Sequence, residues 1–358
     1  MKNKIKLLIL IVGILFAGLV FAHSKQHAQT KQIETAGQKF KNIKVLNEMP
    51  ADQMGKVMNL MSASLGVNCN FCHSSEEDFA KDDNEHKQTA REMLKMTFAL
   101  NKNYFKGQIE VTCNTCHNGK AHPQSAPNLN LIAAENARPK QPETKPAIEQ
   151  ILEKYEQALG GKNSLNKINS RYIKASRVEP NGKAEPEEIW QKGNKLLVVT
   201  TYSQAVVSEA FDGANVWKRA NEHSIPLKAD EAEQIRRVAE LFASANLKAI
   251  YPKMEFGSID RINGREVYQV RAATANNGRE RLYFDRETGL LTRRTASVPT
   301  VLGNFMYQVD YSDYKDFGGV KLPATTRFAV PNISWTRKIL EVKNNAPIED
   351  AKFNQPAK

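Results

Sequence analysis

The pattern of apolar and polar positions divides the 358-residue chain into stretches of different texture. An uninterrupted apolar run covers residues 7–22, and a polar stretch covers residues 23–44. Residues 45–123 place apolar side chains at helical spacing, whereas residues 147–358 alternate short apolar runs with turn residues. Because helices repeat every 3.6 residues and strands every 2, this change of period predicts an α-rich part followed by a β-rich part.

Two helices are predicted in the α-rich part. The first runs from residue 51 or 52 to about residue 65, and Gly66 follows it as the residue type that most often ends a helix. The second runs from about residue 84 to 104, and acidic residues at its start suit the positive end of the helix dipole.

The β-rich part begins with an amphipathic helix that follows Pro146 and ends at about Gly160. A second helical stretch covers residues 230–250. Turn residues separate the remaining apolar runs, as in Asn181-Gly182. The strands are expected at residues 171–178, 187–191, 195–202, 206–211, 267–272, 281–284, 290–296, 306–314, 325–329 and 334–343. The elements predict a multi-domain chain: a mainly α region, then a mainly antiparallel β half-barrel, or curved sheet, with packed helices.

The start of the chain has the layout of a signal peptide. Three lysines precede the apolar run, and its last residues, Val20-Phe21-Ala22, suit cleavage before His23. An uncleaved anchor is the alternative, although 16 apolar residues are fewer than the roughly 20 that a membrane span needs. We therefore expect export to the periplasm, with inner-membrane association if the signal stays uncleaved.

All four cysteines lie in two copies of Cys-x-x-Cys-His, which are Cys69-Asn-Phe-Cys72-His73 and Cys113-Asn-Thr-Cys116-His117. This spacing is typical of c-type haem attachment, in which the two thiols form thioethers to the porphyrin and the histidine binds the iron. A zinc site is one alternative, but zinc does not require a histidine directly after each cysteine pair. Two disulfides are another. We expect two covalently attached haem c groups, with His73 and His117 as iron ligands.

Methionines on the two predicted helices are candidates for the sixth ligand of each iron. They are Met54, Met58 and Met61 on one face of the first helix, and Met93 and Met96 on one face of the second. Such methionines ordinarily pack in a core, but two irons that need a further ligand favour thioether ligation by at least one methionine per helix. Histidine ligation is the alternative, by His86 or His122, which lie in polar segments without a helix to orient them.

Residues 58–73, 90–96 and 111–119 together resemble the cytochrome c subunit of bacterial photosynthetic reaction centres. The resemblance covers about residues 45–123. In that family a helix precedes each haem, and a methionine of the helix is the sixth ligand. The resemblance therefore implies Met58, eleven positions before Cys69, and Met93, in an Ala-Arg-x-Met sequence, as the distal ligands.

Three departures from that family stand out. Its well-known members carry four haem motifs, whereas this chain has two. One of their haems takes a histidine from the loop after the second helix, and residues 101–111 contain no histidine. The family's lipid-bearing cysteine is also missing, because every cysteine of this chain lies in a haem motif. These departures weaken a photosynthetic role and leave a two-haem electron carrier.

The β-rich part resembles the lipoprotein-carrier-like half-barrels of the bacterial periplasm. The resemblance lies in the order helix, Ala-Leu-Gly-Gly, hairpins, helix, and in the run at residues 281–291. It covers most of residues 147–355 and includes no catalytic motif. Such folds hold acyl chains in an apolar concavity, so a lipid or acyl ligand is one expectation. A docking or spacer role is the other.

The sequence thus predicts five segments. They are a signal peptide (1–22), a polar leader (23–44), a two-haem cytochrome c domain (45–125), a proline-rich linker (126–146) and a lipoprotein-carrier-like domain (147–358). The expected function is electron transfer in the periplasm between a protein donor and acceptor, one of which is a membrane redox complex or a reaction centre. No enzymatic role is expected, because filled sixth positions leave no substrate site. A two-haem peroxidase and a haem redox sensor coupled to the β domain are the alternatives.

The charge of the chain adds little to this interpretation. A formal charge of +12 at pH 7 falls to +9 without the three lysines of the signal. The remaining charge is spread over both parts of the chain, so it predicts no nucleic-acid partner. Weak attraction to acidic redox partners or anionic lipid is consistent with such a surface.

Overall fold

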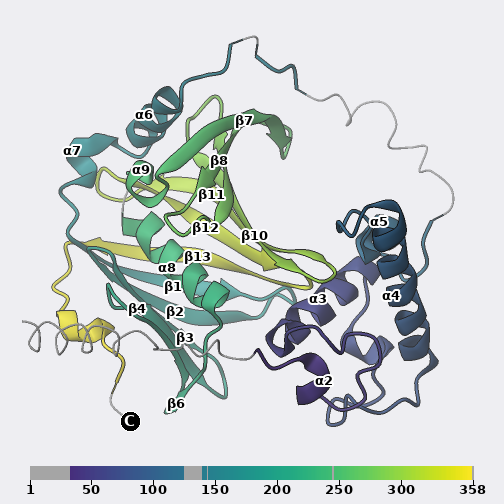
Figure 1. The fold of residues 1–358 in the computed structure, drawn as a ribbon. Helices are drawn as coiled ribbons and strands as arrows, with labels where there is room; N and C mark the ends of the chain where they lie inside the picture. Colours follow the sequence, from purple (N-terminus) through teal and green to yellow (C-terminus); the bar gives the residue numbers. More distant parts are fainter. Residues whose placement is uncertain (1–32, 125–138, 143, 244–245, 357–358) are drawn as a thin grey trace, which may run out of the picture. The chain divides into compact units, whose positions relative to one another are not determined.

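The computed structural model describes residues 33–124, 139–142, 144–243 and 246–356 (Figure 1). The predicted signal peptide and most of the predicted proline-rich linker lie outside these residues. The backbone contacts divide the chain into two compact units, Met1–Ala51 and Asp52–Lys358. No helix in the described ranges has the length and apolar character that crossing a membrane requires.

The described part of the first unit contains the short helix α2 (Ala36–Lys39). A capping box starts it, because Thr35 accepts from the Gln38 backbone while the Gln38 side chain accepts from the Thr35 backbone. The Ala36 N–H donates to the Met49 carbonyl over 2.6 Å. This stretch had been expected to be an extended leader, and local capping makes part of it helical instead.

In the second unit, residues 52–124 form the helical region. After a 3-10 turn, η1 (Ala51–Gln53), helix α3 (Met54–Leu65) ends at Gly66, which adopts a left-handed conformation with φ of 66°. Helix α4 (Glu85–Tyr104) starts at Asn84, whose side chain accepts from the His86 backbone. Both predicted helices are confirmed. Gly66 and Asn84 are residue types that favour the end and the start of a helix.

One face of α4 is buried, and its polar side chains form hydrogen bonds with the neighbouring loops. Arg91 forms a two-pronged ion pair with Asp82, with nitrogen to oxygen distances of 2.7 and 3.0 Å. Leu94 and Thr97 are also buried on this face, and Asn101 completes it. Three of the four buried residues of this face are polar. Hydrogen bonds therefore contribute to how the face packs, alongside apolar contacts.

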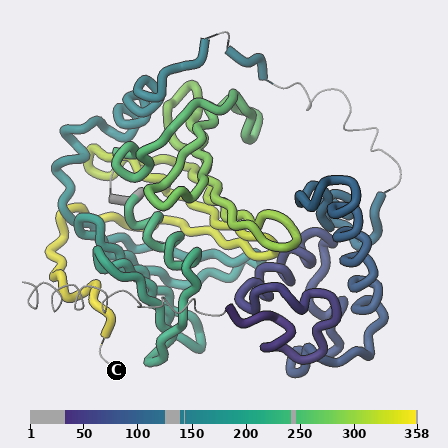
Figure 2. The backbone as a smooth tube through the Cα atoms, in the orientation of Figure 1, coloured from purple at the N-terminus to yellow at the C-terminus, as the bar shows by residue number. Residues whose placement is uncertain are grey.

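The β-rich region, residues 144–356, contains one antiparallel sheet of thirteen described strands in the order β6-β5-β4-β3-β2-β1-β13-β12-β11-β10-β9-β8-β7. The strands are β1 (Ser170–Val178), β2 (Ala184–Lys192), β3 (Lys195–Thr201), β4 (Val206–Phe211), β5 (Val216–Ala220), β6 (His223–Ser224), β7 (Lys253–Ile262), β8 (Arg265–Ala273), β9 (Arg279–Asp285), β10 (Leu291–Thr300), β11 (Gly303–Asp316), β12 (Lys321–Val330) and β13 (Ile333–Asn344). Neighbouring strands follow each other in the sequence except at the centre, where β1 pairs with β13 (Figure 2). The expected curved antiparallel sheet is confirmed.

Helices cover one face of this sheet. The helices are α6 (Ile148–Ala158), α7 (Gly161–Leu165), α8 (Ala229–Ala243) and α9 (Leu247–Ile250). Helix α8 packs across β2, β3, β4 and β5 (Figure 1). One core cluster joins α6 and α9 to strands β7 to β10, and a second joins α8 to the central strands. A 3-10 turn near the C-terminus, η4 (Asp350–Phe353), packs with Trp217 in a separate cluster.

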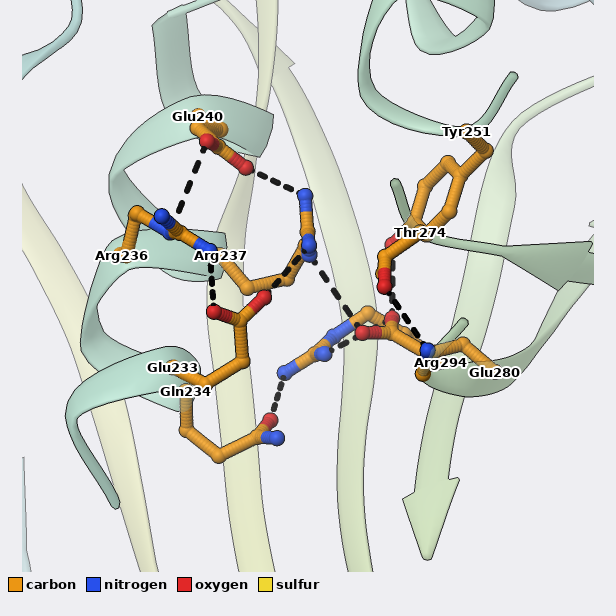
Figure 3. A network of polar contacts seen from close by, with 10 residues as sticks. Glu233, Gln234, Arg236, Arg237, Glu240, Tyr251, Thr274, Glu280 and Arg294 are labelled. Atoms are coloured by element: carbon orange, nitrogen blue, oxygen red, sulfur yellow. Dashed lines mark hydrogen bonds and ion pairs between the residues drawn. The ribbon is translucent and has the colours of Figure 1, made fainter. Parts of the chain in front are cut away.

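A buried polar network fixes α8 to the sheet (Figure 3). Glu280 of β9 accepts from Arg294 over 2.9 Å and from the Tyr251 hydroxyl over 2.7 Å, and it forms an ion pair with Arg237 of α8 at 3.4 Å. Gln234 of α8 accepts from Arg294. Because these charges are almost fully buried, removing one partner would leave the others uncompensated, so the network specifies where α8 sits.

The structure adds elements that the pattern did not predict. Strands β5, β6 and β7 and the short helix α7 were not expected, and the helical stretch predicted over residues 230–250 is divided into α8 and α9. The helix predicted from Pro146 to about Gly160 is confirmed as α6. Strands β6 and β7 are the two edges of the sheet, and β7 carries Gly257 at a register shift. Short or interrupted edge strands have a weak apolar signal, because they bury only part of their side chains.

Candidate functional site

The first Cys-x-x-Cys-His motif forms the 3-10 turn η2 (Cys69–Phe71) between α3 and α4. Cys69 is exposed and Cys72 is half-buried. Asn84, the residue that caps α4, also donates its side-chain amide to the Phe71 carbonyl over 3.1 Å. His86 stacks on Phe71 with 4.1 Å between ring centres. The start of α4 therefore positions the first motif.

His73 lies in an environment that favours its neutral form. Burial and the positive charge of Lys87 lower the pKa of His73, and the backbone near Phe79 only partly opposes them. Its Nδ1 atom is buried, and among the described residues no atom forms a hydrogen bond with it. The Phe79 ring meets the imidazole edge-on at 5.0 Å between centres. A neutral imidazole is the form that binds a metal ion.

The second motif forms the short helix α5 (Cys113–His117). The His117 Nδ1 atom lies 2.9 Å from the Lys120 carbonyl oxygen. A carbonyl oxygen can only accept a hydrogen bond, so this contact places the proton on Nδ1 and leaves the Nε2 lone pair free. A backbone partner on the other ring nitrogen is the usual support for a metal-binding histidine.

The candidate methionines face two different environments. Met93 and Met96 of α4 are 40% and 45% exposed, whereas Met54, Met58 and Met61 of α3 are all half-buried. A thioether face turned away from the protein core is consistent with a large apolar group that lies against α4. On α3, burial does not distinguish Met58 from its two neighbours, so the choice of Met58 still rests on the family resemblance.

The end of α3 contacts the loop after the second motif. The Gly119 N–H donates to the Ser64 carbonyl over 2.8 Å. A Cβ atom on Gly66 would lie 2.1 Å from the Gly119 carbonyl oxygen, so the two backbones approach each other too closely for any side chain. The first methionine helix and the second haem motif are thus held in one small assembly.

Sequence reasoning missed two asparagines that position the motifs. Asn101 of α4 accepts from the backbones of Glu110 and Val111 and donates to the Val111 carbonyl over 2.8 Å. This clamp holds the segment that leads to Cys113, as Asn84 holds Phe71 before Cys72. Asparagine is a preferred residue at a helix start, which is a local signal for Asn84, but no sequence signal points to either tertiary contact.

The alternatives to haem at these cysteines are two disulfides and a zinc site. All four cysteines are free, so no disulfide joins them. Within the described ranges, no group of three or more cysteine, histidine or acidic side chains has an arrangement that could hold a metal ion, as a zinc site would require. Burial raises the pKa of the Cys72 and Cys113 thiols.

The histidine alternatives occupy different positions. His86 falls within the helix predicted over residues 84–104, although it was taken to lack a helix to orient it, and the structure places it in the first turn of α4. It lies against the first motif through Phe71. His122 is exposed beyond the second motif. His86 is therefore the more relevant competitor of the methionines.

Residues 18–153 match the family model of the photosynthetic reaction centre cytochrome C subunit. The photosynthetic reaction center cytochrome c subunit of Roseobacter denitrificans is 29% identical over 99 residues, which are 25% of this chain and 27% of that protein. The chain therefore spans about a quarter of the curated relative that it matches. The family match includes both Cys-x-x-Cys-His motifs and both methionine helices, so it supports a cytochrome c region here.

The β-rich region has structural neighbours of the LolA-like fold. A putative outer membrane lipoprotein-sorting protein domain from Vibrio parahaemolyticus has a TM-score of 0.42 at 12% identity, over 58% of this chain and 97% of that one. A LolA superfamily protein from Nitrosomonas europaea has a TM-score of 0.41 at 14% identity, over 59% and 98%. Similarity at this level supports no conclusion about a ligand or a function of this region.

The β-rich region also contains a cavity of about 290 Å³. It lies between the central strands and helices α6, α7 and α8. Its apolar wall includes Leu159, Ile168, Val238 and Leu322. The cavity has room for a small molecule to bind.

Proposed function

We propose that this chain is an exported two-haem c-type cytochrome that transfers electrons between protein partners. The observation that carries the proposal is the set of two Cys-x-x-Cys-His motifs, each preceded by a helix with a methionine face, in a region that matches the reaction-centre cytochrome family. A bound haem c iron would supply one-electron chemistry by alternating between its ferrous and ferric states.

The residues of the chain have separate roles in this proposal. Cys69 and Cys72 attach one porphyrin, and the second motif attaches the other through Cys113 and Cys116. His73 and His117 are the proximal ligands. The hydrogen bond from His117 Nδ1 to the Lys120 carbonyl orients the imidazole and increases its basicity as a ligand.

Met58 and Met93 are the proposed distal ligands. A thioether stabilises ferrous iron relative to an imidazole, so both haems would have comparatively high reduction potentials. If a histidine and a methionine held each iron, neither iron would offer a site for a substrate, which would suit an electron carrier rather than an enzyme. The donor and acceptor would be proteins, one of them a membrane redox complex or a reaction centre.

The decisive experiment is optical spectroscopy of the purified protein with a pyridine haemochrome count. We expect two haem c groups per chain and a weak methionine-to-iron band near about 695 nm in the oxidised protein. Met58→Ala and Met93→Ala should each reduce that band by about half. Met61→Ala and Met96→Ala are matched controls on the same helices, and they should leave it unchanged.

Other outcomes would select a different function. A high-spin ferric spectrum with peroxide turnover would indicate a two-haem peroxidase, because that activity requires an open iron. If that band is absent and the haem spectrum changes in His86→Ala but in neither methionine variant, histidine ligation of the first haem would be indicated. If the affinity of the β-rich region for a ligand changed with haem oxidation, a redox sensor would replace the simple carrier.

Export to the periplasm is part of the proposal. The layout of residues 1–22 supports export. Export also agrees with the place of c-type haem attachment, which is the outer side of the inner membrane. Mass spectrometry of the native protein should find a mature chain that begins at His23. A chain that retains residues 1–22 and sediments with the inner membrane would indicate an uncleaved anchor instead.

We also propose that the β-rich region holds an apolar ligand. The cavity of about 290 Å³, with aliphatic and aromatic side chains along most of its wall, supports this role. The test is binding of a simple aliphatic molecule such as decan-1-ol to the full-length protein. Val238→Phe, which fills part of the cavity, should abolish that binding.

A further inference from the structure

The cavity of the β-rich region contains a buried hydroxyl group that the fold does not use. Tyr155 of α6 lines the cavity and is only 7% exposed. Within the described residues, no atom forms a hydrogen bond with its hydroxyl group. Its oxygen is also not one of the fully enclosed polar atoms that lack a partner there, so it keeps some open surface. The open space beside this residue is the cavity, and the hydroxyl group therefore faces it.

Two further tyrosines of the cavity differ from Tyr155 in their surroundings. Tyr314 of β11 lines the cavity, but its hydroxyl group donates to the Leu291 carbonyl over 2.7 Å. Burial raises the pKa of Tyr311, and the neighbouring charge of Arg294 partly opposes this rise. The hydroxyl group of Tyr314 therefore serves the fold, whereas that of Tyr155 is available to a ligand.

Burial also decides the chemical form of Tyr155. It raises the pKa of the phenol well above its ordinary value, and nearby Tyr311 acts in the same direction. The phenol therefore keeps its proton at physiological pH and can donate a hydrogen bond. A buried donor without a partner costs free energy, and a ligand atom that accepts its hydrogen bond would remove that cost.

The charged side chains of the cavity already have partners or lie in exposed positions. Arg337 forms an ion pair with Glu187, and Arg171 donates to two neighbouring side chains. Lys162 and Lys321 are exposed, so water and salt screen their charges. Moving a charged group into an apolar cavity is costly unless a partner compensates it. The buried part of the cavity therefore favours an uncharged ligand.

We propose that the cavity binds an uncharged aliphatic molecule with a carbonyl group, whose oxygen accepts a hydrogen bond from the Tyr155 hydroxyl group. A carbonyl oxygen can only accept, so it complements a donor without a partner. The aliphatic part would lie against the apolar wall, which includes Leu159 and Ile168. The inference rests on the proposed ligand-binding role of the β-rich region and is independent of electron transfer.

The test compares octan-2-one with 2-methyloct-1-ene, in which a CH2 group replaces the carbonyl oxygen. Headspace gas chromatography over the full-length holoprotein, stripped of co-purifying lipid, measures how much of each volatile probe is bound. We expect Tyr155→Phe to weaken octan-2-one binding by about five- to tenfold, because one hydrogen bond is lost. The affinity for 2-methyloct-1-ene should stay within about twofold, because the variant keeps the ring and its edge-on contact with Phe284.

Tyr314→Phe is the matched control. The hydroxyl group of Tyr314 already binds the Leu291 carbonyl, so its removal should leave both affinities within about twofold. The same variants test whether the Tyr155 hydroxyl group lacks a structural partner. Thermal unfolding without ligand should show a lower melting temperature for Tyr314→Phe and no decrease for Tyr155→Phe.

Infrared spectroscopy detects the proposed hydrogen bond directly. A carbonyl group that accepts a hydrogen bond absorbs at a lower frequency than a free one, and the ester band of methyl octanoate lies apart from the amide bands of the protein. Bound methyl octanoate should therefore absorb at a higher frequency in Tyr155→Phe than in the wild type. Tyr314→Phe should leave the band where it is.

Several results would overturn the proposal. An octan-2-one affinity that does not change in Tyr155→Phe would remove Tyr155 as the donor. Octanoate that binds at least about tenfold more tightly than octan-2-one would show that the cavity selects a charge. Binding of 2-methyloct-1-ene without octan-2-one would leave a purely apolar site. If neither neutral probe binds, the ligand-binding role itself fails, and the haem count is unaffected.

Discussion

In the β-rich region large apolar side chains pack together in continuous clusters, whereas in the helical region several of them face solvent. Phe284 and Ile259 are at most 2% exposed in the first core cluster of the sheet. In the helical region Phe79 is 54% exposed and Met93 is 40% exposed. The two regions therefore differ in what completes their structure.

The reason for this difference is chemical. A sheet with packed helices can bury its apolar face against its own side chains, and the resulting burial stabilises it. The helical region contains two longer helices and short connecting loops, and polar contacts such as Arg91 with Asp82 occupy its buried face. Two porphyrins would supply the apolar surface that this region lacks. We therefore predict that the helical region would need bound haem to fold and that the β-rich region would not.

The largest effect should follow from loss of haem attachment. In a variant with Cys69→Ser, Cys72→Ser, Cys113→Ser and Cys116→Ser, we expect the amides of α3 and α4 to exchange about 100-fold faster or more, while β1 and β13 keep their protection. Hydrogen exchange with mass spectrometry measures both regions in one sample. Unchanged protection in α3 and α4 would show that the helical region is stable without haem. It would contradict the proposed difference between the two regions.

A second test concerns the close contact between α3 and the second motif. Gly66→Ala places a side chain at a positive φ and against the Gly119 carbonyl, so it should destabilise the helical region by about 3 kcal/mol. Denaturant unfolding followed at the haem bands measures the change. Gly55→Ala is the control on the same helix, because a Cβ there meets nothing within 4 Å. It should stabilise by about 0.5 to 1 kcal/mol.

A third test concerns the exposed methionine face. Met93→Ala should lower the reduction potential of one haem by on the order of 0.1 V, because a thioether that stabilises ferrous iron is lost. Spectroelectrochemical titration resolves the two haems. The neighbouring Met96→Ala should shift neither potential by more than a small fraction of that value. Equal shifts in both variants would mean that the exposed face acts through general polarity rather than ligation.

The smallest effect concerns a turn of the β-rich region. The Arg265 guanidinium holds the pKa of Asp285 below its usual value of 3.8, and Asp285 also accepts from the backbones of Glu287 and Thr288. Asp285→Asn keeps an acceptor for the turn but loses the charge, so it should cost about 1 to 2 kcal/mol at pH 7. Urea unfolding of the β-rich region measures this cost.

The pH dependence of that variant follows from the direction of the shift. A carboxylate with a lowered folded pKa stabilises the protein above its unfolded pKa and loses this contribution as the pH falls through the folded value. The difference between wild type and Asp285→Asn should therefore be full at pH 5 to 7 and shrink below about pH 4. Glu255→Gln, in an exposed pair with Arg271, should change stability by less than about 0.5 kcal/mol.

Local signals explain which elements were predictable. Gly66 ends α3 and Asn84 begins α4 because capping depends on residues within one turn. Turn residues likewise mark where the hairpins reverse direction. Gly182 and Gly289 are examples, and both adopt a positive φ. Strand β5, by contrast, is only five residues long and was missed. Its assignment depends on β4 beside it, which no local pattern reveals.

The sequence by itself determined the haem motifs, the two methionine helices and the change from helical to strand period, because all of these depend on residues close together in the chain. Only the tertiary structure decided that β1 pairs with β13, that Asn101 holds the segment before Cys113, and that Arg171 lines a cavity. Each of these contacts depends on how separate elements pack against one another, and a local sequence pattern does not encode that packing.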